Sequence, residues 1–101
     1  MGDENLVDRV VVSEEDFDHF VEGKMGRRLV EKKIRVLRTL KPGQHMEVYM
    51  ARGRGSKKAL IAYLRKLKEN GLDVGKGKAE YGFEMLPPQD DFRVLVIYKN
   101  D

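Results

Sequence analysis

A basic, glycine-rich turn is the part of this sequence whose residue types best suit binding chemistry. Residues 51–59 read Ala-Arg-Gly-Arg-Gly-Ser-Lys-Lys-Ala, and the cations there are Arg52, Arg54, Lys57 and Lys58. Glycine lets another molecule approach the backbone closely, and Ser56 is a residue type favoured as a helix N-cap. Backbone N–H groups at a helix start, together with arginine or lysine, bind phosphate oxygens. The turn therefore predicts contact with phosphate groups.

A second basic segment repeats the same unusual charge at the start of another expected helix. Lys24 precedes Gly26, Arg27 and Arg28, and Lys32 follows one turn later. A helix start carries a partial positive charge, so each cation there costs about 0.3–1 kcal/mol at low salt. A local rule that is broken twice points to function, and an external anion would remove the conflict.

The charge of the chain is strongly segregated, although its formal net charge is only +3. Residues 22–68 hold 15 Lys and Arg against 3 acids, a local balance of +12, while the flanks hold 5 basic and 14 acidic residues. A basic middle of this strength predicts a binding site for a polyanion.

The residues that enzymes use for catalysis are scarce. The chain has no Cys, its imidazoles are His19 and His45, and its serines, Ser13 and Ser56, are explained as helix caps. The acidic residues at 14–18 and 90–91 are interpreted as solvated surface. We therefore expect no catalytic residues, no metal site and no cofactor, and a protein that is not an enzyme.

Hydrophobic periodicity predicts two helices and several strands. Val10, Val11 and Val12 form a short β-branched run, and residues 14–21 fit either a short helix or a strand. A helix is expected over 27–40, with its apolar stripe on Val30, Ile34 and Leu37, and a second over 57–69. Strands are expected over 46–51, 76–85 and 92–99, with a turn at 86–91. The order predicts an α+β, two-layer βαβαββ sandwich, a four-stranded mixed sheet with two helices on one face.

Domain organisation and location follow from length and composition. We expect residues 1–16 to form a polar, acidic N-terminal extension and residues 17–101 to form one domain. No run of 18 apolar residues and no leader is visible, so a cytoplasmic protein is expected. The high content of Lys and Glu, with no Cys, favours a thermophilic source. The tyrosines, expected to border the core rather than to stack on bases, are Tyr49, Tyr63, Tyr81 and Tyr98.

The chain resembles the Alba family of small nucleic-acid-binding proteins of archaeal chromatin. The resemblance is sharpest over residues 47–54, Glu-Val-Tyr-Met-Ala-Arg-Gly-Arg, followed by Lys58 and Ala59. This segment is similar to that family's strand ending in Ala-Arg-Gly-Arg and to the helix after it. The helix at 29–40 with Gly43, and the segment 67–72, also fit the family's order and spacing.

The resemblance implies a homodimer, or a heterodimer with a related protein, that is chromosome-associated and binds double-stranded DNA, and RNA as well, mainly through the backbone. The family's Gly-Lys-Lys-Pro loop contacts phosphates, and the matching positions here are Gly26, Arg27 and Arg28. The turn at 86–91, which corresponds to the family's long hairpin, is short and acidic in this chain.

Two other functions are compatible with the same charge pattern. One is an RNA-binding subunit of a ribonucleoprotein. The other is a protein-interaction module whose basic surface docks on an acidic partner. The sequence leaves the choice between DNA and RNA open.

Overall fold

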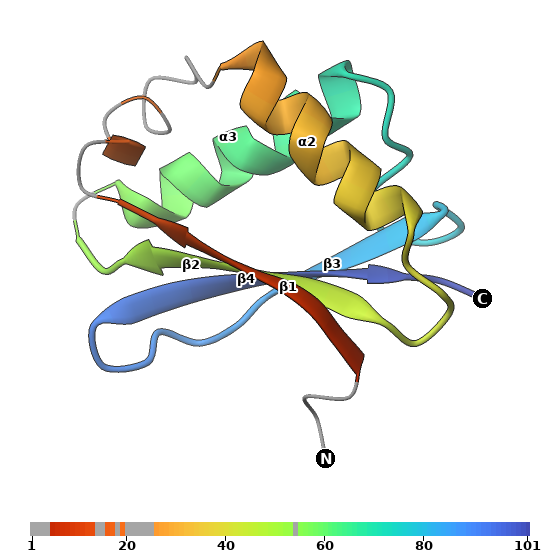
Figure 1. Ribbon diagram of the computed structural model, residues 1–101. Helices are drawn as coiled ribbons and strands as arrows, with labels where there is room; N and C mark the ends of the chain where they lie inside the picture. The colour runs from red at the N-terminus through yellow and green to blue at the C-terminus, as the bar shows by residue number, and fades with distance from the viewer. Residues whose placement is uncertain (1–4, 14–15, 18, 20–25, 54) are drawn as a thin grey trace.

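The computed structural model describes residues 5–13, 16–17, 19, 26–53 and 55–101. Its helices and strands, in chain order, are β1 (Leu6–Val12), α2 (Arg27–Arg38), β2 (His45–Ala51), α3 (Ser56–Glu69), β3 (Tyr81–Met85) and β4 (Phe92–Lys99) (Figure 1). None of the helices in these residues is long and apolar enough to cross a membrane.

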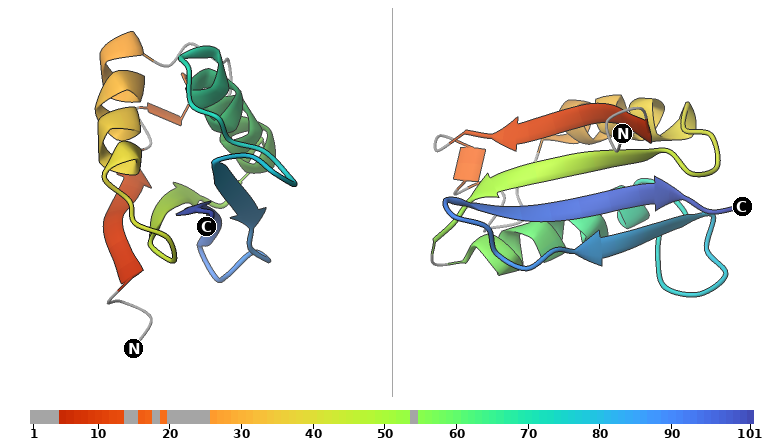
Figure 2. Two further views of the ribbon diagram at one scale, coloured as in Figure 1. Left: turned by 90° about the vertical axis from the view of Figure 1, so that its right-hand side faces the viewer. Right: turned by 90° about the horizontal axis from the view of Figure 1, so that it is seen from below.

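The strands form one mixed sheet with the order β1-β2-β4-β3. The first pair, β1 and β2, is parallel, whereas β4 runs antiparallel to both of its neighbours. Both helices cover the same face of this sheet, as Figures 1 and 2 show. The predicted α+β fold, with four strands in a mixed sheet and two helices on one face, is confirmed.

The first strand lies in the segment that was expected to be an extension outside the domain. β1 pairs with β2 in parallel register, with Val10 opposite Val48 and Val12 opposite Met50, and Val12 is buried. The boundary expected at residue 16 therefore separates a strand from its own sheet. Two adjacent polar residues, Asp8 and Arg9, interrupt the apolar residues of β1 and concealed its length.

Only part of the segment expected to be a helix or a strand, residues 14–21, is described. The carbonyl of Ser13 accepts hydrogen bonds from the N–H groups of Asp16 and Phe17, both at 3.1 Å. The Asp16 N–H also donates to the Ser13 hydroxyl at 3.3 Å, which is the contact an N-cap makes. This agrees with the expected capping role of Ser13. The strand alternative rested on Phe20 and Val21, which lie outside the described residues.

The hydrophobic core lies between the sheet and the two helices. α2 contributes the predicted stripe of Val30, Ile34 and Leu37, because residues spaced by three and four share one helix face. The strand β2 alternates in the same way and buries Met46, Val48 and Met50. The other fully buried core residues come mainly from α3 and β4: Ala59, Leu60, Tyr63, Leu67, Leu95 and Ile97. The core thus follows the periodicity of the sequence.

Both helices end close to where the sequence placed them. α2 ends at Arg38, two residues before the expected end, and Gly43 takes a positive φ of 88° in the following turn. At the end of α3 the Leu72 N–H bonds to the Leu67 carbonyl, and the Gly71 N–H bonds to the Lys68 carbonyl. These two bonds, with Gly71 at φ 99°, form a Schellman motif.

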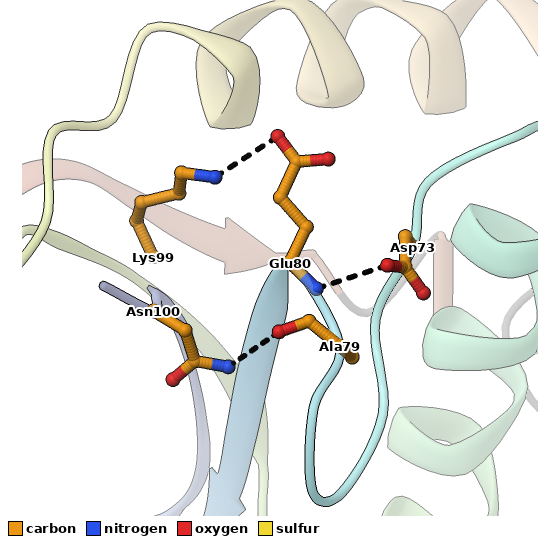
Figure 3. A network of polar contacts seen from close by, with 5 residues as sticks. All are labelled: Asp73, Ala79, Glu80, Lys99 and Asn100. Carbon is orange, nitrogen blue, oxygen red and sulfur yellow. Dashed lines mark hydrogen bonds and ion pairs between the residues drawn. The ribbon is translucent and has the colours of Figure 1, made fainter.

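The strand β3 is shorter than the sequence predicted, because it begins at Tyr81 instead of residue 76. The residues before it form a loop that is fastened to the end of β4 (Figure 3). Asp73 accepts the Glu80 N–H at 3.0 Å, Lys99 Nζ pairs with Glu80 at 2.9 Å, and the Asn100 amide donates to the Ala79 carbonyl at 2.8 Å. These side-chain bonds replace strand pairing in residues 76–80.

We predict that two leucines of α2 differ widely in their contribution to stability. Leu37 is 0% exposed and Leu29 is 36% exposed. Leu37→Ala should lower the free energy of unfolding by about 2–5 kcal/mol, since it opens a cavity in the core. Leu29→Ala, the matched control, should cost less than about 1 kcal/mol. Urea unfolding measures both, and equal losses would show that the core does not lie where the structure places it.

Candidate nucleic-acid interface

The two basic helix starts lie toward the same end of the sheet. Each of the parallel strands β1 and β2 is followed by a helix that runs back over the sheet in the opposite direction. Both helices therefore begin on the side to which the arrowheads of β1 and β2 point (Figure 1). Segments that are about 30 residues apart in the chain thus contribute to one end of the molecule.

The start of α2 is exposed and positively charged. Gly26 precedes the helix in an extended conformation, and within the described residues no side chain caps this end. Arg27 bonds to Glu31 at 3.1 Å, but its side chain is 83% exposed. Arg28 is exposed and has no ion-pair partner in the described part of the chain, and the same holds for Lys32.

The start of α3 differs from the prediction at Ser56. Gly55, with a positive φ of 87°, occupies the N-cap position, and Ser56 is the first residue of the helix. Ser56 is 2% exposed, and its hydroxyl accepts a hydrogen bond from Arg93 Nε at 3.3 Å. The predicted capping role of Ser56 is therefore wrong, because a left-handed glycine makes the turn and the serine side chain points into the protein.

Arg52 is exposed, but it is also tied to the hairpin between β3 and β4. Its N–H donates to the Asp91 carbonyl at 2.7 Å, and its guanidinium Nη1 donates to the Asp90 carbonyl at 3.4 Å. Asp90 itself takes a positive φ of 39° in the tip of this hairpin. Arg52 thus has donors left for a ligand, but it also holds the acidic hairpin tip against the basic turn.

Of the remaining predicted site residues, two are described by the structure and two are not. Lys57 and Lys58 are exposed in the first turn of α3, which contains no acid. Around Gly53 there is open space, since nothing lies within 4 Å of where its Cβ would be. Lys24 and Arg54 lie outside the described residues.

Arg93 is a further cation at this end of the molecule, and it was not among the site residues predicted from the sequence. It lies in β4 opposite Met50 of β2, on the side of the sheet that faces the helices, and it reaches the start of α3. An arginine in the same alternating register as buried Leu95 and Ile97 was the available signal. Such a residue needs a polar partner, which the structure identifies as the Ser56 hydroxyl.

The four tyrosines divide between the core and the helix-free face of the sheet. Tyr63 and Tyr81 are fully buried, and burial raises the pKa of both phenols, with nearby Asp8 and Glu80 respectively adding to the rise. Tyr49 lies edge-on to Phe92, with the ring centroids 5.8 Å apart, and the Arg9 guanidinium lies over its ring. Tyr98 covers Gly82, where a Cβ would lie 2.4 Å from its ring.

The acidic residues of the described part do not gather into a metal site. No group of three or more His, Asp or Glu with suitable positions occurs there. Asp90 and Asp91 stand at the hairpin tip beside Arg52. At this end of the sheet they oppose the positive charge of the helix starts.

We predict that Ser56 and Arg93 act as a pair. Ser56→Ala should lower the free energy of unfolding by about 0.5–1.5 kcal/mol, because Arg93 loses its acceptor. The combination with Arg93→Met should cost less than the sum of the single changes by at least about 0.5 kcal/mol. Thr39→Ala with Arg93→Met is the control and should be additive, since Thr39 ends α2 and bonds to Val36. Additivity of the first pair would show that the hydrogen bond contributes nothing.

The chain was compared with protein-family models, with curated proteins and with solved structures, and none of them matches it. The charges, hydrogen bonds and exposure of the residues described above are therefore the main guide to function.

Proposed function

We propose that this protein binds the phosphate backbone of double-stranded nucleic acid, with duplex DNA as the first candidate, largely independently of base sequence. The observation that carries the proposal is the pair of helix starts at one end of the sheet, neither of which has a side-chain cap within the described residues. Neither α2 nor α3 has an acid in its first turn, and each presents exposed cations there. Contacts to phosphates fix position and carry no direct sequence information.

The electrostatics of a helix start favour phosphate binding over the alternative that these cations only solvate the protein surface. Arg27, Arg28, Lys57 and Lys58 each place a positive charge near the positive end of a helix dipole, at a cost of about 0.3–1 kcal/mol apiece at low salt. A bound phosphate reverses the sign of this interaction, because it accepts the free N–H groups and pairs with the cations. Phosphate binding then removes an electrostatic repulsion that is present in the free protein.

Several cations elsewhere in the structure are paired with acids. Lys33 pairs with Asp8 at 3.0 Å, Lys99 with Glu80 at 2.9 Å and Lys66 with Glu69 at 3.7 Å. By contrast Lys57 and Lys58, like Arg28 and Lys32, have no ion-pair partner among the described residues. These four cations are therefore available for a ligand, whereas Arg27 is shared with Glu31.

The resemblance of residues 47–59 to the Alba family supports the same proposal. The resemblance extends the proposal to an architectural, chromosome-associated protein that acts as a homodimer or with a related chain. An RNA-binding ribonucleoprotein subunit and docking on an acidic protein are the alternatives. Titration with duplex DNA, duplex RNA and an acidic polypeptide of equal charge separates the three.

Salt dependence is the direct test of phosphate binding. For the wild-type protein, log K for duplex DNA should fall linearly with log salt. Lys57→Gln/Lys58→Gln should reduce the magnitude of the slope by about 1.8, that is about 0.9 for each phosphate contact. The same change should not lower stability, because it removes two cations from a helix start.

The control for this experiment is Lys76→Gln/Lys78→Gln. It changes the net charge equally but lies in the exposed loop after α3, at the opposite end of the sheet (Figure 1). This control should keep the wild-type slope. Absence of binding at low salt would refute the proposal. Equal slopes for the two variants would show that the start of α3 does not contact phosphates.

We expect the acidic hairpin tip to weaken binding. Asp90→Asn/Asp91→Asn should raise the affinity for duplex DNA by roughly two- to tenfold at low salt, because it removes two exposed negative charges beside Arg52. Asparagine tolerates the positive φ of residue 90, so the hairpin should be retained. Fluorescence anisotropy measures the change. An unaltered or lower affinity would place the hairpin tip away from the phosphates.

A further inference from the structure

The outer face of α2 carries a row of cations that extends well beyond the start of the helix. Arg28, Lys32 and Arg35 follow one another at spacings of four and three residues, so they lie along one side of the helix. All three are exposed, whereas Val30, Ile34 and Leu37 on the opposite side are buried against the sheet. We call these three cations the outer row. The core packing of α2 is what turns the outer row toward solvent.

The outer row is not neutralised by the rest of the protein. Glu31, the acid within α2, bonds to Arg27, and Lys33 pairs with Asp8. No ion pair is made by the outer row within the described residues. Neighbours of like charge at these spacings repel each other on an isolated helix. α3 shows a different pattern, because its exposed face includes Ile61 and its last turn includes Glu69.

We propose that α2 lies lengthwise along one phosphate strand of the nucleic acid, so that Arg35 is a binding residue in addition to those at the helix starts. From Arg28 to Arg35 the row rises about 10 Å, at about 1.5 Å per residue. One strand of duplex DNA presents a phosphate about every 3.4 Å along the axis, or three phosphates over this length. Successive members of the outer row rise about 6 and 4.5 Å along the helix, so they do not match the phosphates one to one, but the row is long enough to reach two or three phosphates of one strand. This inference rests on the proposed function and adds the mode of contact.

A comparison of two arginines separates lengthwise contact from contact at the helix starts alone. Arg35 lies about 12 Å along α2 from Arg27, and Arg65 lies about 13 Å along α3 from Ser56. Both arginines are exposed. If phosphates met only the helix starts, the two residues would be equally remote and would behave alike.

The experiment measures the salt dependence of duplex DNA binding for Arg35→Gln and Arg65→Gln. Arg35→Gln should reduce the magnitude of the slope of log K against log salt by about 0.9, while Arg65→Gln should leave it unchanged. Arg35→Lys keeps the charge and should restore the wild-type slope, which excludes a loss caused by altered folding. Equal slopes for Arg35→Gln and Arg65→Gln, or a loss that Arg35→Lys does not restore, would overturn the inference. The proposed function would stand in that case, because it fails only if the wild-type protein itself does not bind.

Discussion

The parallel pairing of β1 with β2 is the constraint on which the rest of the structure depends. Parallel neighbours need a crossover connection, and here α2 provides it across the face of the sheet. Because β1 and β2 point the same way, the helix that follows each of them starts at the same end. The positive charges of two segments thereby lie toward the same end of the molecule, although the chain separates them by about 30 residues. The register that places Val12 opposite Met50 thus positions the candidate interface as well as the core.

The candidate interface combines a rigid support with a charge distribution that the free protein does not compensate. The apolar sides of α2 and α3 are fixed by the core, so their charged sides face solvent in a defined direction. Cations at a helix start and in a row repel one another, whereas Lys33, Lys66 and Lys99 are paired with acids. Natural sequences keep such local conflicts mainly where a ligand resolves them. The hairpin tip with Asp90 and Asp91 limits the same site from one side.

Particular residues show how far local patterns carried the prediction. The stripe of Val30, Ile34 and Leu37 follows helical period and is buried as expected. The β-branched run of Val10, Val11 and Val12 was recognised, but it was assigned to an extension outside the domain, because Asp8 and Arg9 interrupt the apolar residues of β1. Ser56 has the residue type of a cap, yet the cap is Gly55, since a glycine at positive φ was available one position earlier. Both errors, the placement of β1 and the cap at Ser56, arose where neighbouring residues favoured different local structures.

The sequence by itself determined the order of helices and strands, the buried stripe of each helix and the segregation of charge, because these depend on periods of two to four residues. Only the tertiary structure decided that β1 belongs to the sheet, that Arg93 bonds to Ser56 and that Arg52 holds the hairpin tip. The contacts of Arg93 and Arg52 join residues 37 to 39 positions apart, and they depend on the register of β2 against β4. A local pattern contains no information about that register, which depends on how the whole core packs.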